Sequence, residues 1–478
     1  MHLSKNLDEN INLLKETFPL NKSFDLITRD LYLGETKAFF LAINGFIKAD
    51  LLQRLFSDLQ NPLYTKDLHI DDLETYMNAK IGYAQVSLCN DPDKIIKDVL
   101  SGPSVLFIDG FDYALLIDAR TYPARGIEEP DTEKVTKGAK DGFVETLLFN
   151  TNLIRRRIRN PKLTFSMKTI GSDSKTDVAI AYIDGIIDEE LLEKLNKKLD
   201  SLDVTSLTMG SRSLEELLVK KRLFNPLPSF HVTERPDVAC SYLLEGHMVI
   251  IVDNSPGVLI LPCTIFEFTQ SPEDYYKSTA SGNYVRFIRF VSSILSLLLL
   301  PLFLLLATYA DILPKELHVL TTQEIAPFKL FIYVLFIEFG LDLFNYSSSH
   351  AASGFSNSLG IIGGLIISDI AIELKWASLE VIFYGAATLL LTLSLSSIEF
   401  GEAIRIYRIF LVFLTGFFKI YGFVAGLILI IISVITTPVF GGKSYFWPLY
   451  PFNWKALKTL LFRYPTPKAQ PSKIWKEK

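Results

Sequence analysis

Two acidic residues lie inside an apolar stretch in the C-terminal half of the chain. Glu338 and Asp342 are four residues apart within Pro327–Phe344, so they would share one face of a helix. Carboxylates in an apolar helix are costly, and they usually face water or the interior of the protein. One interpretation is a polar path for water or a cation. The other is a hydrogen-bonded pair that is buried and holds helices together.

A segment rich in glycine and serine follows, over Ser353–Ile372. Small residues let helices approach closely, and in an oligomer such a helix would allow a narrow pore with an apolar constriction. The alternative is small-residue packing within one subunit, and the sequence alone leaves both open, as well as whether the segment spans or re-enters. The candidate pore or gate residues are Asn357, Ser358, Ile361, Ile362, Leu365 and Ile366.

The densest basic patch is the run Arg155, Arg156 and Arg157 with Arg159 close behind. One interpretation is contact with anionic lipid headgroups or with an acidic partner. The other is a solvated helix face that ends at Pro161.

Enzymatic chemistry is not predicted. Dinucleotide-binding, phosphate-loop, zinc-protease and nucleophile-elbow motifs do not occur, and the histidines are scattered. Cys89, Cys240 and Cys263 lie far apart without a CxxC pair, which argues against a zinc site or a disulfide framework and indicates a reducing compartment. We therefore expect no catalytic residue, no cofactor and no metal, and a protein that is not an enzyme.

Composition divides the chain into two parts. Its 478 residues carry a net charge of −5 and are 49% hydrophobic, with a mean hydropathy of +0.27. These values exclude a disordered chain and give no basic field for nucleic acid. The averages hide a split, because residues 1–285 have the composition of a soluble domain whereas residues 286–440 are mostly apolar. No basic, apolar signal peptide opens the chain, so we expect the N-terminal part to stay in the cytosol.

The first part contains a duplication. Lys37–Leu55 and Asp177–Leu195 each have a buried strand, a glycine break and a helix with an apolar stripe. Residues 99–118 and 243–262 each have two apolar strands joined by a tight turn, Asp109–Asp112 in one and Asp253–Gly257 in the other. The common order predicts an α/β region of two related subdomains, although a chance likeness of two strand–helix units is the alternative.

The second part has four apolar stretches, each a candidate for crossing a bilayer. Arg286 and Arg289 precede the first, and a lysine-rich tail follows the last, so both ends are expected on the cytosolic side and the number of crossings is even, four or six. The last stretch is too long for one crossing and is either one tilted helix or two that turn near Lys419–Gly422. The stretches are Phe290–Tyr309, Pro327–Phe344, Leu379–Ile398 and Ile406–Thr437.

Several short motifs, distributed over residues 25–465, resemble the A subunits of the GerA-type spore germinant receptors. The matching pieces are Asn225–Pro228, Thr233–Asp237, Leu243–Gly246, Val252–Pro256, Pro262, Glu273–Tyr276, Arg286 with Arg289, Ile170 with Gly171, Ser174, Thr176–Ala179 and Tyr182–Gly185. One departure is Ile337–Phe344, which keeps the acidic positions of the family but lacks its arginine. That departure argues against a role as the nutrient receptor proper.

The resemblance implies a membrane protein of spore germination. It implies a ring homo-oligomer, a pentamer, that releases monovalent cations or amplifies their release, in the spore inner membrane with both termini on the core side. Its partners would be other copies of itself, another small membrane protein or receptor subunits, and the lipid bilayer, with no nucleic acid. Alternatives are a membrane-anchored scaffold for receptor complexes and a component of dipicolinate release.

Gating by the cytosolic region would need residues that couple it to the membrane helices. The candidates are Glu234 and Arg235, as an ion pair, with Arg286 and Arg289 at the start of the first span; a structural salt bridge in a turn is the alternative for the first two. The expected divisions are an N-terminal segment 1–24, subdomains 25–135 and 136–285, a transmembrane helical domain 286–440 and a basic tail 441–478.

Overall fold

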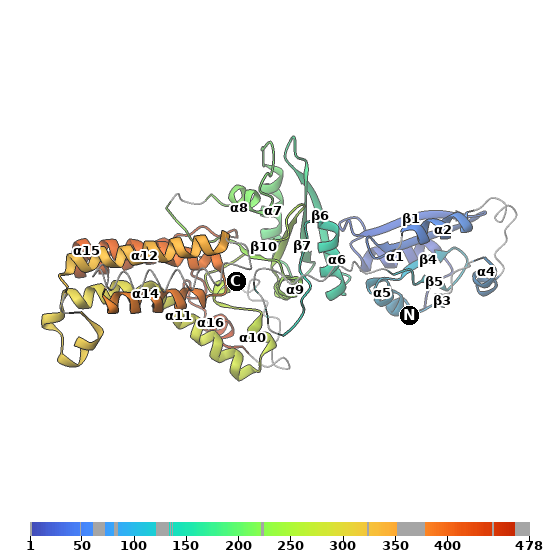
Figure 1. Cartoon of the computed structure of the whole chain (residues 1–478). Helices are drawn as coiled ribbons and strands as arrows, with labels where there is room; N and C mark the ends of the chain where they lie inside the picture. The colour runs from blue at the N-terminus through green and yellow to red at the C-terminus, as the bar shows by residue number, and fades with distance from the viewer. Residues whose placement is uncertain are drawn as a thin grey trace. The chain divides into compact units, whose positions relative to one another are not determined.

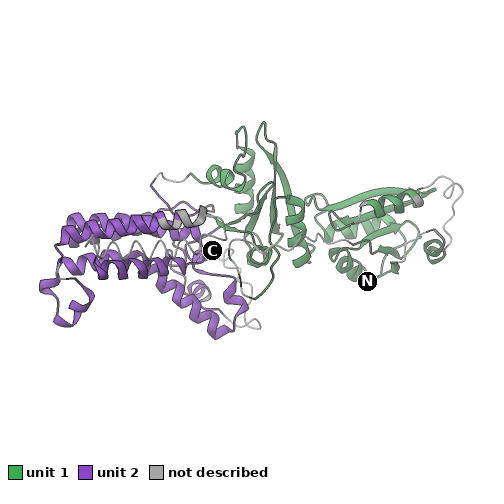
Figure 2. Ribbon diagram, viewed as in Figure 1, with its two compact units in different colours: residues 1–220, 230–262, 470–478 green, residues 221–229, 263–469 purple. Residues whose placement is uncertain are grey.

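The computed structural model describes residues 2–47, 49–60, 72–80, 85–120, 133, 135, 137–220, 224–322, 325–350, 378–441 and 444–463. The chain forms two compact units (Figure 2). The first contains residues 1–220 and 230–262, and the second contains residues 221–229 and 263–469. The predicted domain boundaries within and after the first unit stay predictions.

The first unit contains two five-stranded sheets of the same topology (Figure 1). Their strand orders are β1-β2-β4-β5-β3 and β6-β7-β9-β10-β8, and every neighbouring pair is antiparallel. The predicted duplication is therefore confirmed. The strands are β1 (Leu26–Leu33), β2 (Thr36–Ile43), β3 (Val86–Cys89), β4 (Ser104–Ile108), β5 (Ala114–Ile117), β6 (Leu163–Ile170), β7 (Thr176–Ile183), β8 (His231–Thr233), β9 (Met248–Val252) and β10 (Val258–Leu261).

The helices of this unit repeat as well. An aspartate follows β4 in the first sheet and β9 in the second, and each accepts a hydrogen bond from the first turn of a helix. Asp109 accepts from the Leu7 amide and Asp253 from the Leu147 amide, both at 3.1 Å. The negative charge suits the positive end of each helix. The helices are α1 (Leu7–Thr17), α2 (Ala49–Leu59), α4 (Leu73–Lys80), α5 (Pro92–Leu100), α6 (Leu147–Arg157), α7 (Glu189–Asp200), α8 (Ser211–Leu218) and α9 (Pro236–Leu244).

Helices cover both faces of the first sheet. Helices α1 and α5 pack on the face that carries Leu41 and Phe107, whereas α2 and α4 pack on the face that carries Phe40 and Leu106. A strand covered on both faces needs apolar side chains at every position, not at alternate ones. This is why 38–43 of β2 are all buried and hydrophobic.

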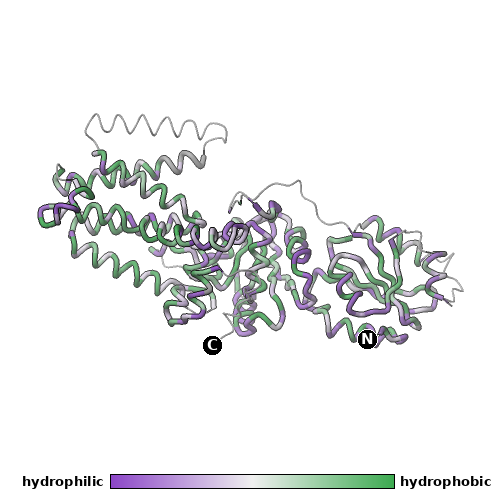
Figure 3. Tube along the Cα trace, turned by 90° about the horizontal axis from the view of Figure 1, so that it is seen from below, coloured by the Kyte–Doolittle hydropathy of each residue, from purple (hydrophilic) through white to green (hydrophobic). Residues whose placement is uncertain are grey.

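The second unit is a set of largely hydrophobic helices (Figure 3). Helix α11 packs against both α14 and α15, and α12 packs against α14. The helices are α10 (Glu273–Tyr276), α11 (Thr279–Thr308), α12 (Pro327–His350), α14 (Leu379–Leu393), α15 (Ile398–Ile435) and α16 (Trp454–Leu461), with short 3-10 turns at Glu267–Thr269, Ala310–Ile312 and Lys315–Leu320.

Helix α15 is a helical hairpin. Its backbone leaves the helical region at Lys419, where φ is 55° and ψ is −132°. The hydroxyls of Tyr407 and Ser433 lie 2.7 Å apart, although 26 residues of continuous helix would separate them by about 39 Å. Of the two predicted arrangements for this stretch, the turn near Lys419–Gly422 is confirmed.

Two helices of the described residues are long and apolar enough to cross a membrane, α11 and α15, and α14 is a shorter apolar helix. Helix α12 covers the predicted second stretch but carries Lys329, Glu338 and Asp342. The number of crossings, four or six, stays a prediction.

Candidate functional site

A buried ion pair joins α12 to the first leg of α15. The Nε and Nη2 atoms of Arg408 donate to the two carboxylate oxygens of Glu338, the second at 2.9 Å. The Nη1 atom donates to the carbonyl oxygen of Ser296 on α11, also at 2.9 Å. The side chains of Arg408 and Glu338 are only 4% and 2% exposed. All three guanidinium nitrogens thus have acceptors, and one arginine ties three helices together.

A second ion pair lies one helical turn away and is much more open. Arg405 donates to Asp342 at 2.8 Å, and the two side chains are 20% and 33% exposed. The pairing order reverses, with 338 opposite 408 and 342 opposite 405, so α12 and this leg run antiparallel. Exposed Phe339, Leu343 and Ile406 surround the pair in sequence. Charge therefore reaches an otherwise apolar surface at this point.

The structure separates the two acidic residues that the sequence grouped. Glu338 lies between helices, as the second interpretation expects, with Arg408 as its partner. Asp342 lies at the surface of the unit. The candidate pore or gate residues Asn357, Ser358, Ile361, Ile362, Leu365 and Ile366 lie outside the described residues, and their role stays a prediction.

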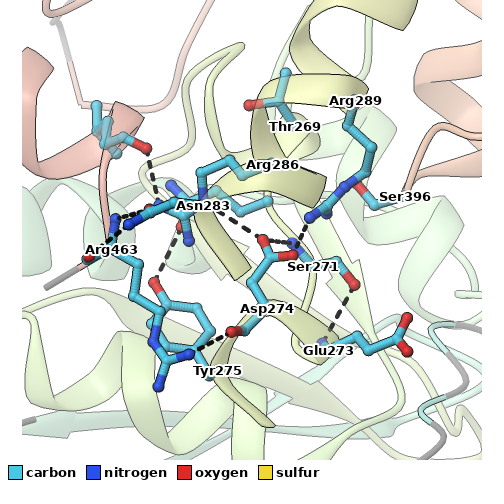
Figure 4. Close-up of polar contacts among 12 residues, drawn as sticks. Thr269, Ser271, Glu273, Asp274, Tyr275, Asn283, Arg286, Arg289, Ser396 and Arg463 are labelled. Carbon is cyan, nitrogen blue, oxygen red and sulfur yellow. Dashed lines mark hydrogen bonds and ion pairs between the residues drawn. The ribbon is translucent and has the colours of Figure 1, made fainter. Parts of the chain in front are cut away.

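Arg286 and Arg289 converge on one buried carboxylate at the start of α11 (Figure 4). Arg289 donates to one oxygen of Asp274, and Arg286 donates to the other at 3.4 Å. Arg463, beyond α16, donates to the backbone oxygens of Asp274 and Lys277 at 2.6 and 2.7 Å. The three arginines thus fasten α10, α11 and the end of α16 to one another.

The structure pairs Arg235 with Asp237 and not, as the sequence predicted, with Glu234. Arg235 is fully buried and donates instead to Asp237, with Nη2 2.8 Å from Oδ2. A proline at 236 starts α9, so the Asp237 carboxylate, in the first turn, can reach back to the guanidinium. Arg235 also donates to the backbone oxygens of Glu133 and Ala139, at 3.4 and 2.9 Å, so this motif is bonded to the segment before α6. A coupling role for Glu234 and Arg235 stays a prediction.

A buried acidic and histidine group lies beside that turn. Thr233 donates to Glu133 at 2.6 Å, and the His231 ring approaches the same carboxylate at 3.4 Å. Burial alone would raise the pKa of Glu133, but the His231 and Thr233 hydrogen bonds lower it below its usual value. Burial lowers the pKa of His247 to about 3, so this ring is neutral at physiological pH.

The arginines at 155–157 do not form one common surface, which both sequence interpretations of the run assumed. Arg155 is fully buried, and its Nε donates to Asp25 at 2.7 Å while Nη2 donates to the Leu163 carbonyl at 2.9 Å. Arg157 forms a bidentate pair with Asp141 at 2.6 and 2.7 Å. The run therefore carries internal joints of the first unit, because a guanidinium with several acceptors tolerates burial.

Among the described residues, no group of three or more His, Cys, Asp or Glu side chains is placed to hold a metal ion. The three cysteines are free and buried. Burial raises the pKa of the Cys240 thiol to about 12, so it is not a reactive thiolate.

Sequence reasoning missed Arg408, Arg405, Asp274 and Arg463. The signal for the first two was the presence of opposite charges at two apolar stretches: Glu338 and Asp342 lie within one, and Arg405 and Arg408 lie at the start of the other. Charges of opposite sign at helical spacing can neutralise one another across two helices. The partners Asp274 and Arg463 carried no such signal, because both lie in polar segments.

A family model described as Bacillus/Clostridium GerA spore germination protein matches residues 12–473. The chain is 34% identical over 466 residues to Stage V sporulation protein AF of Bacillus subtilis, covering 98% of this chain and 94% of that protein. It is 28% identical over 470 residues to Spore germination protein KA of the same organism, covering 97% and 85%. Both alignments therefore run through both compact units.

One solved structure also resembles the chain. It is the N-terminal domain of the A subunit of the Bacillus megaterium spore germinant receptor GerK3, at 28% identity and a TM-score of 0.42. The match covers 54% of this chain and 96% of that domain.

Proposed function

Because the chain belongs to the Bacillus/Clostridium GerA family of spore germination proteins, we propose that it is a subunit of a homo-oligomeric channel for monovalent cations. The channel releases cations, or amplifies their release, across the inner membrane of the germinating spore. The ring is a pentamer, both termini face the spore core, and the hydrophobic helices of the second unit cross the bilayer. Another small membrane protein or receptor subunits act with it.

The observation that carries the proposal is the half-buried ion pair of Asp342 and Arg405 at the surface of the unit. Charged groups at the lipid-facing surface of a membrane helix are unfavourable by several kcal/mol at mid-bilayer. A pair that is 33% and 20% exposed therefore calls for water or a neighbouring subunit on that side of the unit. An aqueous path between subunits supplies both, and a carboxylate on its wall favours cations.

Buried Glu338 has a different part in this proposal. Its carboxylate is neutralised by Arg408 and holds α12 against α11 and α15. This joint fixes the position of Asp342, which lies on the same helix face one turn along. The proposed path thus rests on Asp342 for its charge and on Glu338 for its geometry.

The gate is proposed in the small-residue segment Ser353–Ile372, with Ile362 among its constricting residues. Coupling from the first unit is proposed to act through Arg286 and Arg289, because these residues join α11 to α10 and to the end of α16. A displacement of α10 would then move the start of α11.

The test is cation flux from liposomes that contain the purified full-length protein with Ile362→Cys. A bulky soluble thiol reagent is expected to abolish the flux. The natural cysteines are buried, so background labelling is low, and Tyr421→Cys at the exposed turn of the hairpin is the matched control that should leave flux unchanged. Absence of flux from an intact oligomer, even with germination partners added, would favour the scaffold.

A further inference from the structure

The arginines at the start of α11 carry more positive charge than their protein partners neutralise. Arg286 and Arg289 share the single carboxylate of Asp274, and Arg463 donates to the backbone oxygen of the same residue. Neighbouring Glu273 forms its own pair with Lys277 at 3.1 Å. Among the described residues of this cluster, three cations accompany one anion, which leaves an excess of two positive charges.

Three nitrogens of this cluster are buried without an acceptor. They are Nη2 of Arg286 and Nε and Nη1 of Arg289. Both side chains are more than nine-tenths buried. Buried polar atoms in native proteins almost always have partners, and a charged donor without one is especially unfavourable. Among the residues that the structure describes, the cluster is therefore incomplete, and an anionic acceptor would complete it.

The surroundings indicate where the acceptor comes from. Exposed aromatic side chains flank the arginines in all three segments: Tyr275 on α10, Tyr284 and Phe287 on α11, and Trp454 on α16. The ring of Tyr275 also lies 5.5 Å from the Arg286 guanidinium carbon. Exposed tyrosine and tryptophan beside basic residues, next to an apolar helix, are typical of the headgroup layer of a membrane.

We propose that Arg286, Arg289 and Arg463 bind the phosphate group of an anionic phospholipid. A guanidinium presents N–H donors that match phosphate oxygens, and Nε and Nη1 of Arg289 with Nη2 of Arg286 are the donors that lack an acceptor. The site rests on the proposed membrane placement of α11. Lipid binding would complete the joint between α10, α11 and α16, and so strengthen the segment through which coupling is proposed.

The test uses delipidated full-length protein in a neutral detergent, with bound lipid counted by native mass spectrometry. Phosphatidylglycerol, phosphatidylcholine and inorganic phosphate are the three probes. We expect phosphatidylglycerol to be retained about tenfold or more over phosphatidylcholine, the equivalent of one charge-assisted hydrogen bond. Equal retention of the two lipids would overturn the proposal. Retention of inorganic phosphate in place of lipid would overturn the lipid source while keeping the phosphate chemistry.

Variants localise the effect. Arg286→Gln should remove the preference, whereas Lys277→Gln, a nearby cation outside the cluster, should keep it. The triple variant Asp274→Asn with Arg286→Gln and Arg289→Gln removes the two buried arginines together with the carboxylate that they share. It should lose the preference without leaving a lone buried charge, so it covers the case in which the single variant does not fold. Unchanged preference in both would contradict the site. Insertion of the protein into phosphatidylcholine vesicles is measured separately. A protein that does not insert would contradict the membrane placement of α11. A protein that inserts but shows no lipid preference would contradict this site alone.

Discussion

The two ion pairs between α12 and α15 differ in what surrounds them, although they lie one helical turn apart. Glu338 and Arg408 are sealed between three helices, and every guanidinium nitrogen has an acceptor. Asp342 and Arg405 have the same chemistry but are half-buried at the surface of the unit. A buried ion pair in apolar helices holds those helices together, whereas a half-buried pair can also contact water. Burial therefore decides between these two roles.

The first unit also contains a fully buried ion pair. Arg155 and Asp25 are both 1% exposed, and the guanidinium also donates to two backbone carbonyls. This pair joins the segment before β1 to the start of β6, and so the two sheets to each other. A sealed pair in each unit therefore lets the effect of burial be tested twice, in two different surroundings.

The largest expected effect is from Arg408→Met. The substitution leaves the Glu338 carboxylate buried without a partner, which costs about 3–5 kcal/mol of folding free energy. The expected result is a large drop in the thermal unfolding temperature of the detergent-solubilised protein, with lower yield in the membrane.

The double variant Glu338→Gln with Arg408→Met separates charge from shape. It carries no buried ion, so most of the lost stability should return. If Arg408→Met alone were as stable as the wild type, the pair of Glu338 and Arg408 would not be buried in the membrane-bound protein.

Arg155→Met tests the same rule in the first unit. Removing this cation leaves Asp25 buried and should destabilise the full-length protein by about 3 kcal/mol or more. Chemical denaturation followed by the fluorescence of the chain would measure it. Lys197→Met breaks an exposed pair with Glu193 and is the control, expected to change stability by less than about 1 kcal/mol.

Acid should weaken the first unit through His247. Burial holds its pKa at about 3 in the folded chain, against 6.5 without burial. The unfolded chain therefore binds an additional proton between these values, so stability falls as the pH falls from about 6.5 toward 3. His247→Phe should flatten this dependence by at least about 1.4 kcal/mol, the equivalent of one pKa unit.

The measurement is the denaturation midpoint of the full-length protein between pH 7 and pH 4. Glu133 contributes at more acidic pH, because its lowered pKa gives stability that is lost as the pH falls below its usual value and through its folded value. A His247→Phe variant with the wild-type pH dependence would show that this ring is not sealed.

The smallest effect on stability is expected from Asp342→Asn. A half-exposed ion pair contributes about 0–1 kcal/mol, so the unfolding temperature should change little. A loss comparable to that of Arg408→Met would remove the distinction between the two pairs and would place Asp342 among the joints of the helix bundle.

The repeated fold was predictable because it depends on local patterns. Continuous apolar runs such as 38–43 and 178–183 identify strands buried on both faces, and the turn residues between paired strands identify hairpins. The edge strands were not predicted. β3 and β8 are only four and three residues long, so they carry too few positions for a periodic signal. β1 and β6 are eight residues long, but their buried and exposed positions do not alternate regularly.

The candidate site was less predictable because its partners are distant in sequence. Glu338 was found from its own surroundings, but Arg408 lies 70 residues away. The spacing of one helix cannot say which residue of another lies opposite. Likewise, the run at 155–157 was interpreted as a surface patch, since nothing in a row of arginines reveals that Asp25, 130 residues earlier, receives the first of them.

Cation flux through Asp342→Asn tests the central claim most directly. Purified full-length wild type, Asp342→Asn and the exposed-loop control Glu316→Gln would be reconstituted into potassium-loaded liposomes at equal protein and oligomer content. We expect flux from the wild type and the control, and a clear reduction in Asp342→Asn despite its nearly unchanged stability. Flux from Asp342→Asn equal to that of the wild type would contradict the assignment of this helix face to the cation path.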